Sequence, residues 1–357
     1  MILAAGVGSR LDPLTKSMPK PLVPILGRPV MEYIINLCKK HGFTNLSANI
    51  HMMANMMLEH FRNAGKNFDV TLNMVHEKDL TGVAGGIRSC KKFLTQDAVL
   101  IIMGDALTDA DLSSLYEKHI ESNCAVTIGI TEVGDTSQFG VVVTDKNNHV
   151  ISFQEKPKPE EAKSNLANTG IYFFNQRVLS EMPPEKDMPI YDVAKDLFPE
   201  LMSKKIPMQA IKIKGYWADI GTLKQYKRSI KDVLDGRVFI SPTAEKTKYG
   251  FKEKNAKIDP LIKILGKAYL GSNIKIGKNV TLSGYCCIEE GCVIEDDCYI
   301  DNSVIWAGTR ISTGTKVINS IIGDNCNVTK GVDVLSNSVW APKSHIKAGS
   351  TPSIVFK

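Results

Sequence analysis

The first two thirds of the chain alternate between short apolar runs and segments with helical spacing. Val99–Met103 is a continuous apolar run typical of a buried strand, and Val126–Ile130 resembles it. Helical spacing of apolar residues appears between such runs, as in Val30–Lys40 and Asp111–Ser122. Strands that alternate with helices favour a mostly parallel sheet covered on both faces. We therefore expect one α/β domain over residues 1–236.

The same patterning predicts further elements. Asp235-Gly236 is a stop signal for the last predicted helix, because glycine accepts the left-handed conformation that ends helices. The polar segment 237–260 has no strong periodicity, which predicts a connector. The additional strands and helices are Ile2–Ala5, Gly140–Val143, Gly170–Phe174, Met56–Asn63 and Leu223–Leu234.

The final third of the chain has a period of six residues. Aliphatic or aromatic residues recur at every sixth position, and a second column of smaller residues runs two positions earlier. Six is the period of a hexapeptide solenoid, a triangular coil into which both columns point. We expect a left-handed parallel β-helix over residues 261–357. The first column is Leu270, Ile276, Leu282, Ile288, Ile294, Ile300 and Trp306, resuming after a slip at Ile322, Val328, Val334, Trp340 and Ile346. The second column is Ala268, Ile274, Val280, Cys286, Cys292, Cys298 and Val304.

Two features of this third have alternative interpretations. Small or turn-forming residues fall at the expected corners, although short strands with such turns also fit an antiparallel sandwich. The spaced cysteines look like a metal cluster, but a spacing of six puts Cys286, Cys292 and Cys298 on successive faces of the coil. We expect them, and Cys326, to be inward fillers. The corner residues are Gly271, Gly277, Asn279, Gly291, Asn302, Gly323 and Asn325.

Composition narrows the classes of partner. The chain has 357 residues, with 44 Lys and Arg against 38 Asp and Glu, and a net charge of +6. This excess is small and forms no basic tail, so we expect no nucleic-acid partner. No apolar run approaches the roughly 20 residues that span a membrane. The apolar opening run is too short for a signal peptide, so we expect a reducing cytoplasm for the eight cysteines.

A glycine loop follows the first predicted strand. Gly6 and Gly8 stand directly after Ala5, where glycines let backbone N–H groups approach a phosphate chain. Arg10 adds a side chain that binds phosphate through two nitrogens. The loop is not a Walker A motif, since no Gly-Lys-Ser/Thr follows, and Leu11 stands where a dinucleotide-binding loop has its third glycine.

The continuation of this loop, as far as Pro24, resembles the signature of the sugar-nucleotide pyrophosphorylases, or nucleotidyltransferases. Further motifs resemble that family in the expected order, over about residues 1–236, and a hexapeptide solenoid is common behind them. The motifs are Thr81-Gly82-Val83-Ala84-Gly85, Gly104-Asp105, Phe139-Gly140-Val141-Val142, Glu155-Lys156-Pro157, Asn168-Thr169-Gly170-Ile171-Tyr172 and Trp217-Ala218-Asp219-Ile220-Gly221-Thr222.

The resemblance implies a Rossmann-like fold and a defined reaction. A hexose 1-phosphate attacks the α-phosphorus of an NTP and pyrophosphate leaves. Such chemistry needs positioning and charge neutralisation. Arg10, Lys20 and Asp105 are the implied catalytic residues, with Arg10 holding the departing pyrophosphate and Lys20 near the α-phosphate. The implied nucleotide-binding residues are Leu3, Ala4, Ala5, Gly6, Gly8, Ser9, Arg10, Glu77, Gly82, Ala84 and Gly85.

Two carboxylates are candidate ligands for Mg²⁺. Asp105 ends an apolar strand, where open α/β sheets bind ligands, and Asp219 lies in a loop before the last helix. Mg²⁺ prefers few protein carboxylates together with phosphate oxygens. The alternative for each residue is a turn or helix-capping role.

The second substrate would meet a further set of residues. The resemblance implies that Glu155 accepts hydrogen bonds from sugar hydroxyls and that Lys156 binds the sugar phosphate. A surface ion pair before a proline turn is the alternative for these two. Gly140, Asn168 and Tyr172 are expected to line the sugar pocket, although Asn168 also suits a turn.

The base and the sugar are harder to assign. By resemblance Glu77 lies near the base edge, and a carboxylate, which only accepts hydrogen bonds, suits the N–H groups of guanine. The segment Gly82–Gly85 resembles guanylyl members, whereas Asp105–Leu107 and the residues around Phe139 resemble uridylyl members. We expect GTP and mannose 1-phosphate. UTP, dTTP or ATP with glucose 1-phosphate is the alternative.

Other roles compete with catalysis. A non-catalytic regulatory subunit would lack the loop arginine, Lys20 or a metal carboxylate, yet all are present. An acyltransferase solenoid usually needs a histidine base, and His345 near the end is the one histidine there. We expect the solenoid to mediate homo-oligomer contacts instead, since a solenoid end must be capped or paired.

Overall fold

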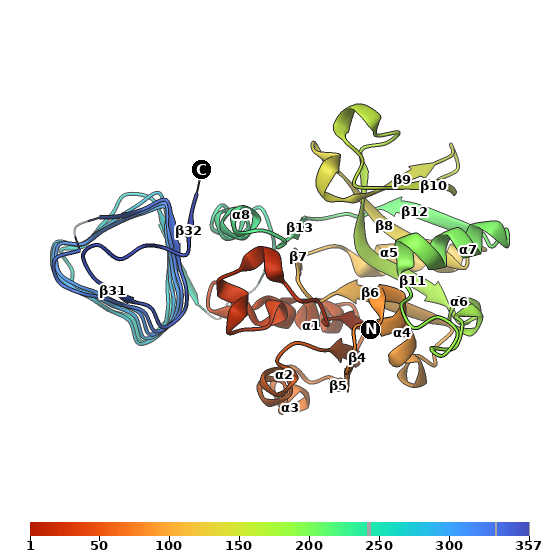
Figure 1. Ribbon diagram of the computed structural model, residues 1–357, viewed down its shortest axis with the longest axis horizontal. Helices are drawn as coiled ribbons and strands as arrows, with labels where there is room; N and C mark the ends of the chain where they lie inside the picture. The colour runs from red at the N-terminus through yellow and green to blue at the C-terminus, as the bar shows by residue number, and fades with distance from the viewer. Residues whose placement is uncertain (241–243, 333, 357) are drawn as a thin grey trace. The chain divides into compact units, whose positions relative to one another are not determined.

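The computed structural model describes residues 1–240, 244–332 and 334–356. The chain divides into two compact units (Figure 1). The sheet unit comprises Met1–Val7 and Val30–Asp219, and the β-helix unit comprises Gly8–Pro29 and Ile220–Lys357. The segment after the first strand therefore belongs with the β-helix, not with the sheet. In the described ranges, no helix is long and apolar enough to cross a membrane.

The sheet unit contains a nine-stranded sheet flanked by helices, which confirms the expected Rossmann-like α/β fold. Its strands are β1 (Ile2–Leu3), β4 (Asn45–Ile50), β5 (Thr71–His76), β6 (Ala98–Met103), β8 (Val126–Glu132), β9 (Gly140–Thr144), β10 (Val150–Glu155), β11 (Leu166–Asn175) and β12 (Met208–Lys212). Its helices are α1 (Val30–Lys40), α2 (Ala54–His60), α3 (Ala64–Phe68), α4 (Gly82–Ser89), α5 (Leu112–Glu121), α6 (Gln176–Glu181), the π-helix η7 (Val193–Leu197) and α7 (Phe198–Ser203).

The sheet is mixed, in contrast to the mostly parallel sheet that the patterning favours. Strands β6, β1, β4 and β5 pair in parallel, and β12 pairs in parallel with β8. Strand β11 runs antiparallel to β6, β8 and β9, and β9 runs antiparallel to β10. A short apolar run carries no information about strand direction, so the pattern finds the strands but not their orientation.

Alternation along the strands divides the core between the two faces of the sheet. Val99 and Ile101 of β6 pack in a cluster with side chains of α4, α6, η7 and α7. On β11, Phe174 joins this cluster, whereas Phe173 stacks on His119 of α5 with ring centroids 5.8 Å apart. Successive side chains of a strand point to opposite faces, so a sheet covered by helices on both sides requires apolar residues at both.

Side-chain caps set where two of the predicted helices begin. The carboxylate of Asp111 accepts a hydrogen bond from the Ser114 N–H at 3.0 Å, just before α5. The hydroxyl of Thr222 accepts one from the Gln225 N–H at 3.2 Å, just before α8 (Leu223–Leu234). Each cap satisfies an N–H that the first helical turn leaves without a partner. Helix α8 then ends at the predicted stop, where Gly236 has φ +74°.

The final third is a β-helix of three sheets that form the sides of a prism (Figure 1). Pairing within them is parallel, except for one antiparallel strand at each end of the first sheet. The structure differs from the predicted connector, because β14, β15 and β16 lie within residues 237–260. The first side comprises β14 (Glu245–Thr247), β15 (Gly250–Lys252), β18 (Lys267–Leu270), β21 (Tyr285–Ile288), β24 (Val304–Ile305), β27 (Ile321–Ile322), β30 (Ser338–Trp340) and β32 (Ile354–Val355). The second comprises β16 (Lys257–Ile258), β19 (Lys275–Ile276), β22 (Val293–Ile294), β25 (Arg310–Ile311), β28 (Asn327–Val328) and β31 (His345–Ile346). The third comprises β17 (Lys263–Ile264), β20 (Thr281–Ser283), β23 (Tyr299–Asp301), β26 (Lys316–Ile318) and β29 (Val334–Ser336).

The inward columns are confirmed up to Ile300, after which the period slips earlier than predicted. Leu270 pairs with Ile288, eighteen residues on, but Ile288 pairs with Ile305, seventeen residues on. Ile305 therefore belongs to the prism core, and the inward positions predicted for Val304 and Trp306 are wrong. A corner that is one residue shorter turns the next side chains to the opposite face. The side chain of Val334 lies outside the described part, and the adjacent Leu335 is in the core.

The cysteines of the prism are inward fillers, as predicted. Cys286, Cys292, Cys298 and Cys326 are at most 1% exposed and belong to the apolar core. Their thiols face backbone carbonyls of the coils, as at 3.1 Å between Cys292 Sγ and the Trp306 oxygen. Burial raises the pKa of the Cys292 thiol to about 12. All eight cysteines are free, and the described residues include no cluster of three metal-ligating side chains.

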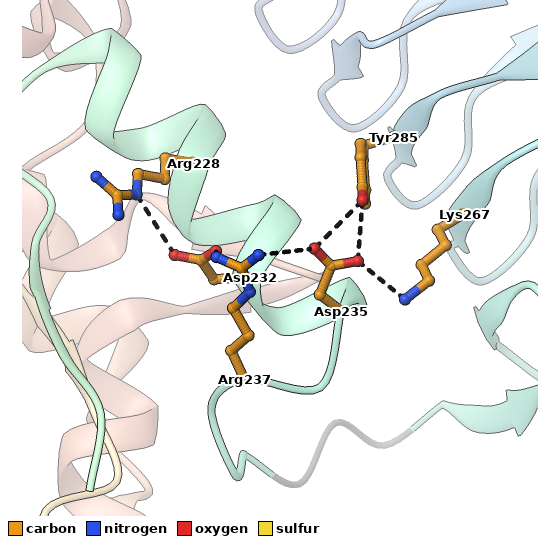
Figure 2. Close-up of polar contacts among 6 residues, drawn as sticks. All are labelled: Arg228, Asp232, Asp235, Arg237, Lys267 and Tyr285. Carbon is orange, nitrogen blue, oxygen red and sulfur yellow. Dashed lines mark hydrogen bonds and ion pairs between the residues drawn. The ribbon is translucent and has the colours of Figure 1, made fainter.

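Helix α8 is fixed to the β-helix by a charged network at its C-terminal end (Figure 2). Asp235 accepts hydrogen bonds from Lys267 Nζ and from the Tyr285 hydroxyl, both at 2.9 Å. Burial acts to raise the pKa of Asp235, but these two hydrogen bonds hold it below its usual range. Arg237 reaches back to the buried Asp232 at 3.1 Å. The contacts of Asp235 thus join the end of the helix to strands β18 and β21, which lie far away in sequence.

The inward column yields a prediction about stability. Replacing Ile294, which is 1% exposed in the prism, with alanine removes buried methyl groups and leaves a cavity. We expect I294A to lose about 2–4 kcal/mol of unfolding free energy in urea titrations. The matched control is V293A at the half-buried neighbouring position, with an expected loss of less than about 1 kcal/mol. Equal losses in the two variants would contradict the inward assignment.

Candidate active site

The carboxyl ends of β1 and β6 lie side by side in the sheet unit. The Gly104 N–H donates to the Leu3 oxygen at 2.9 Å, directly after the last paired residues of both strands. A Cβ on Gly104 would lie 2.9 Å from the Ile2 side chain, so this close approach requires glycine. Asp105 follows and is half-buried. It therefore lies at the edge where parallel strands of an open α/β sheet place ligand-binding residues.

Asp219 is held close to Asp105 by a short ribbon. Strand β13 (Trp217–Asp219) pairs antiparallel with β7 (Ala106–Thr108), and Asp219 is the partner of Ala106. The ribbon is secured where Asp109 Oδ1 accepts a hydrogen bond from the Tyr216 N–H at 2.5 Å. Asp105 directly precedes β7, so the two predicted metal carboxylates stand at neighbouring positions at one end of this ribbon. A pair of carboxylates with room for phosphate oxygens is the donor set that suits Mg²⁺.

The predicted phosphate loop has one glycine in open space and one in a packed turn. A Cβ on Gly6 would meet no atom of the described residues within 4 Å. Gly8, in the β-helix unit, has φ +74°, and its Cβ would lie 3.0 Å from Lys20 Cβ. The Lys20 side chain is 6% exposed and its stem lies along this turn, whereas Arg10 and Ser9 are exposed. Packing thus explains Gly8, while Gly6 leaves room for a ligand.

Glu77 is the centre of a buried polar network in the sheet unit. It is 6% exposed, and its Oε1 accepts a hydrogen bond from Asn49 Nδ2 at 2.6 Å. Its Oε2 accepts one from the Thr81 hydroxyl at 2.8 Å. Asn49 Oδ1 in turn accepts from the Ala4 N–H at 3.0 Å. The network ties the ends of β1 and β4 to the start of α4. A carboxylate has about four acceptor sites, and these hydrogen bonds leave capacity for a ligand. Contact between Glu77 and a base stays a prediction.

The glycines at the start of α4 are required by packing. Gly82 has φ +80°, and its Cβ would lie 2.6 Å from the Tyr191 backbone oxygen. That oxygen accepts a hydrogen bond from the Gly85 N–H at 2.9 Å, and the Tyr191 N–H donates to the Thr81 oxygen at 2.8 Å. Ala84 is fully buried in the same turn. These contacts account for the motif without a ligand, and a role in nucleotide binding stays a prediction.

An irregularity in β11 positions two of the predicted sugar residues. Asn168 pairs with Ile130 and Tyr172 with Ile128, so two extra residues of β11 form a bulge. Within it Gly170 has φ +72° and donates its N–H to Asn168 Oδ1 at 3.0 Å. Asn168 Nδ2 donates to the Tyr172 hydroxyl at 2.9 Å. Bulges redirect side chains and recur beside active sites. Burial raises the pKa of Tyr172 above its usual range.

A cavity of about 380 Å³ lies between β9, β10, β11 and the helical segment that follows. Gly140, Glu155 and Asn168 line it, and Glu155 is the strand partner of Gly140. Tyr172 contacts the cavity residue Asn168 through the hydrogen bond described above. Lys156 is exposed, has φ +48° and lies 3.3 Å from Glu155 as an ion pair. The remaining lining residues are Ser152, Phe153, Gln154, Ala194, Pro199 and Met202.

Two aromatic residues were not assigned a role from the sequence. Phe139, next to Gly140, packs edge-on against Trp217, with ring centroids 5.5 Å apart. Trp217 Nε1 is buried, and no hydrogen-bond partner for it lies among the described residues. A buried donor without a partner is costly, so this N–H is a candidate to bind a substrate oxygen. The signal in the sequence was the position of Trp217 two residues before Asp219.

The match to a family model covers the whole sheet unit and α8. The model for nucleotidyl transferases matches residues 1–236. The chain belongs to the nucleotidyl transferase family. Residues 252–351 match a second model, described as the GMPPB C-terminal domain. The enzyme thus carries a nucleotidyl transferase domain followed by a β-helix domain, which confirms the resemblance seen in the motifs.

Curated relatives and solved structures agree with this family. A UTP–glucose-1-phosphate uridylyltransferase from Synechocystis is 33% identical over 98% of this chain and 84% of its own length. A putative mannose-1-phosphate guanyltransferase from Sulfolobus acidocaldarius is 29% identical over 78% of this chain and 72% of its own. A putative glucose-1-phosphate thymidylyltransferase from Bacillus anthracis, solved with sucrose, is 25% identical with a TM-score of 0.58, covering 68% of this chain and 96% of that one.

The packed start of α4 leads to a prediction. In G82A the new methyl group would clash with the Tyr191 carbonyl at a backbone conformation that alanine rarely adopts. We expect a loss of at least about 2 kcal/mol of unfolding free energy by denaturant titration. The control is G134A, where the described residues leave the Cβ position empty within 4 Å. An unchanged stability in G82A would contradict the packing role.

Proposed function

We propose that this nucleotidyltransferase transfers a guanylyl group from GTP to mannose 1-phosphate and releases pyrophosphate. The observation that carries the choice of base is the buried carboxylate of Glu77. Hydrogen bonds from Asn49 and Thr81 fix its oxygens beside the end of β1. A fixed, acceptor-only group complements the N1–H and N2–H donors of guanine. The match of residues 252–351 to the GMPPB C-terminal domain supports the same choice.

The phosphate chain is the proposed partner of the glycine loop. Gly6 leaves space for a close backbone approach, and the exposed guanidinium of Arg10 is proposed to bind the departing pyrophosphate. Lys20 is 6% exposed, so its side chain would lose little conformational entropy on binding the α-phosphate. Ser9, Leu3, Ala4 and Ala5 complete the proposed contacts. These groups neutralise charge that builds up as the bond to pyrophosphate breaks.

Asp105 and Asp219 are the residues proposed to hold Mg²⁺. Nucleotidyltransferases of this family generally use a divalent metal, and the adjacent positions of the two carboxylates fit one. The ion would supply neutralisation of the NTP phosphates. The chain's own contribution is the rigid ribbon of β7 and β13, which fixes the two carboxylates relative to one another.

The cavity beside Gly140 is the proposed sugar pocket. Glu155 and Asn168 offer acceptors and donors to hydroxyl groups, and Lys156 offers a cation to the sugar phosphate. The ion pair between Glu155 and Lys156 leaves both groups exposed, so each exchanges water, not a buried partner, for substrate. The Tyr172 hydroxyl positions Asn168 by accepting a hydrogen bond from its side-chain amide.

UTP with glucose 1-phosphate is the second candidate pair. The Synechocystis uridylyltransferase matches 98% of this chain, which favours the alternative. The deciding experiment measures pyrophosphate release from five NTPs, each paired with glucose, mannose and N-acetylglucosamine 1-phosphates, in the presence of Mg²⁺. We expect kcat/KM for GTP and mannose 1-phosphate to exceed every other pair by at least about tenfold. A preference for UTP and glucose 1-phosphate would establish the second candidate. Absence of pyrophosphate release with every pair would refute catalysis.

Removing one proposed metal ligand gives a further prediction. D105N replaces the carboxylate with a neutral amide of the same shape, so charge and metal binding are lost while packing is preserved. We expect kcat to fall by at least about a thousandfold. The control is D97N, at the exposed residue just before the opposite end of the same strand, with an expected kcat within about twofold of wild type. Retained turnover in D105N would remove this residue from the metal site.

Three further expectations continue as proposals. Residues 1–236 are proposed as the catalytic domain and 261–357 as the β-helix domain, and the predicted connector 237–260 is proposed to join them while contributing β14, β15 and β16 to the prism. Homo-oligomer formation is proposed to use the β-helix, and the cytoplasm is the proposed location.

A further inference from the structure

A buried carboxylate of the β-helix contacts the segment that carries Arg10 and Lys20. Glu289 directly follows β21 and is 3% exposed. Its Oε1 accepts a hydrogen bond from the Gly27 N–H at 3.1 Å and lies 3.2 Å from the Cys287 thiol. All of these residues belong to the β-helix unit. A carboxyl group so deep in a protein has a specific structural or functional reason, because its desolvation is costly.

The turn that Glu289 contacts has a backbone conformation that is unfavourable for one of its residues, Leu26. Strands β2 (Pro24–Ile25) and β3 (Arg28–Pro29) form a hairpin, and its two loop residues, Leu26 and Gly27, have φ +47° and +77°. Positive φ at both positions is the geometry for which Asn-Gly is strongly preferred. A leucine there is strained, because its Cβ approaches the following carbonyl. Contacts from elsewhere must hold such a turn.

Those contacts come from the β-helix and from α8. The Leu26 N–H faces the Cys287 sulfur, and the Leu26 side chain is 1% exposed. The Tyr226 hydroxyl donates to the Pro24 oxygen at 2.8 Å and accepts from Trp306 Nε1 at 2.8 Å. A methyl group on Gly27 would clash with the Tyr269 hydroxyl. The hairpin is therefore bound along its whole length by one face of the prism and its attached helix.

The hairpin is linked to Lys20 by one tight turn. The 3₁₀ turn η3 (Lys20–Leu22) ends where the Val23 N–H donates to the Lys20 oxygen at 3.0 Å. Pro24 follows at once and begins β2. A shift of the hairpin would thus move the backbone of Lys20, because a hydrogen-bonded turn is all that separates the two. Positioning errors of about 1 Å are enough to slow a reaction that depends on alignment.

We propose that Glu289 is a positioning residue for nucleotidyl transfer, which holds the Leu26–Gly27 turn and through it the phosphate-binding segment Gly8–Pro29. The inference rests on the proposed function, since it assigns the β-helix a part in the same reaction. The β-helix domain then contributes to the rate of chemistry within its own chain, in addition to any role in assembly. Glu289 touches no substrate and acts through Gly27.

Ionisation of Glu289 separates this role from a purely structural one. Burial raises the pKa of Glu289 to about 7, hydrogen bonds from Cys287 and Gly27 oppose this, and Glu290 and Glu253 reinforce it. Among the described residues it also interacts with the uncharged Tyr226 of α8, Tyr269 of β18 and the Cys292 thiol. A carboxylate accepts a hydrogen bond more strongly than a neutral acid. The hold on Gly27 therefore strengthens as the pH rises through about 7.

Stability has the opposite dependence on pH. The pKa of Glu289 is higher in the folded chain than its ordinary value of 4.5, so the native state binds more protons between pH 4.5 and about 7. The contribution of this group to stability therefore falls as the pH rises through that interval. A residue that only stabilised the fold would make activity and stability fall together. A positioning residue makes kcat rise while the melting temperature falls.

The test compares E289A, E289Q and the control E290A. Glu290 is the adjacent exposed carboxylate, hydrogen-bonded to Asn273. Pyrophosphate release is measured with the best substrate pair of the wild type, from pH 6 to 8. We expect kcat of E289A to fall about tenfold, with E290A within about twofold of wild type. E289Q keeps an acceptor oxygen, so it retains most activity at pH 6 but lacks the rise near pH 7.

Each outcome decides between the proposals. Wild-type kcat in a folded E289A, or an inflection near pH 7 that persists in E289Q, would overturn the positioning role alone. Silence of the wild type with every substrate pair would instead overturn the proposed function. If E289A fails to fold, the pH profile of E289Q decides. Amide hydrogen exchange of residues 25–28 provides an independent check, and faster exchange in E289Q than in E290A is expected.

Discussion

The position of β1 is the constraint on which the sheet unit depends. This strand of two paired residues lies between β4 and β6, and all three end at the same edge. Gly104 allows β6 to close against β1, and Asn49 binds the backbone of Ala4 from the other side. Asp105 directly follows Gly104 in sequence, and Glu77 accepts a hydrogen bond from Asn49. The carboxyl groups thus acquire their places from backbone packing at a single point, and a larger residue at Gly104 would displace them together.

Periodicity predicts the fold well wherever one face of an element is buried. Val30–Lys40 and Leu223–Leu234 have the predicted bounds, because apolar spacing and end signals agree. The six-residue columns predict the β-helix equally well, because every coil requires apolar residues at its inward positions. Strand direction, the antiparallel pairing of β11 and the exact coil at which the period slips were not predictable. These depend on how distant segments meet, and Trp306 fits the column as well as Ile305 does until the corner length is known.

The candidate site was predictable as residue types and in part as geometry. Asp105 and Asp219 were found as motif residues, and their adjacency follows from the β7–β13 pairing, which no local pattern encodes. The glycines of a motif are the harder case. Gly82 is accounted for by the Tyr191 backbone, whereas Gly6 has no such explanation in the described chain, and a sequence cannot distinguish the two. Contacts between residues far apart in sequence decide which glycine serves packing.

The short corner after Ile300 changes which outward positions are equivalent on successive coils of the prism. Coils joined by an eighteen-residue step superimpose position by position, so any outward site would recur on each of them. Two successive seventeen-residue steps, from Ile288 to Ile305 and from Ile305 to Ile322, break that translation, and the first leaves the Trp306 indole outside the prism core. The outward surface of the prism therefore differs from coil to coil. The missing residue of the first short corner, not an added motif, thus brings Trp306 into contact with Tyr226 of helix α8.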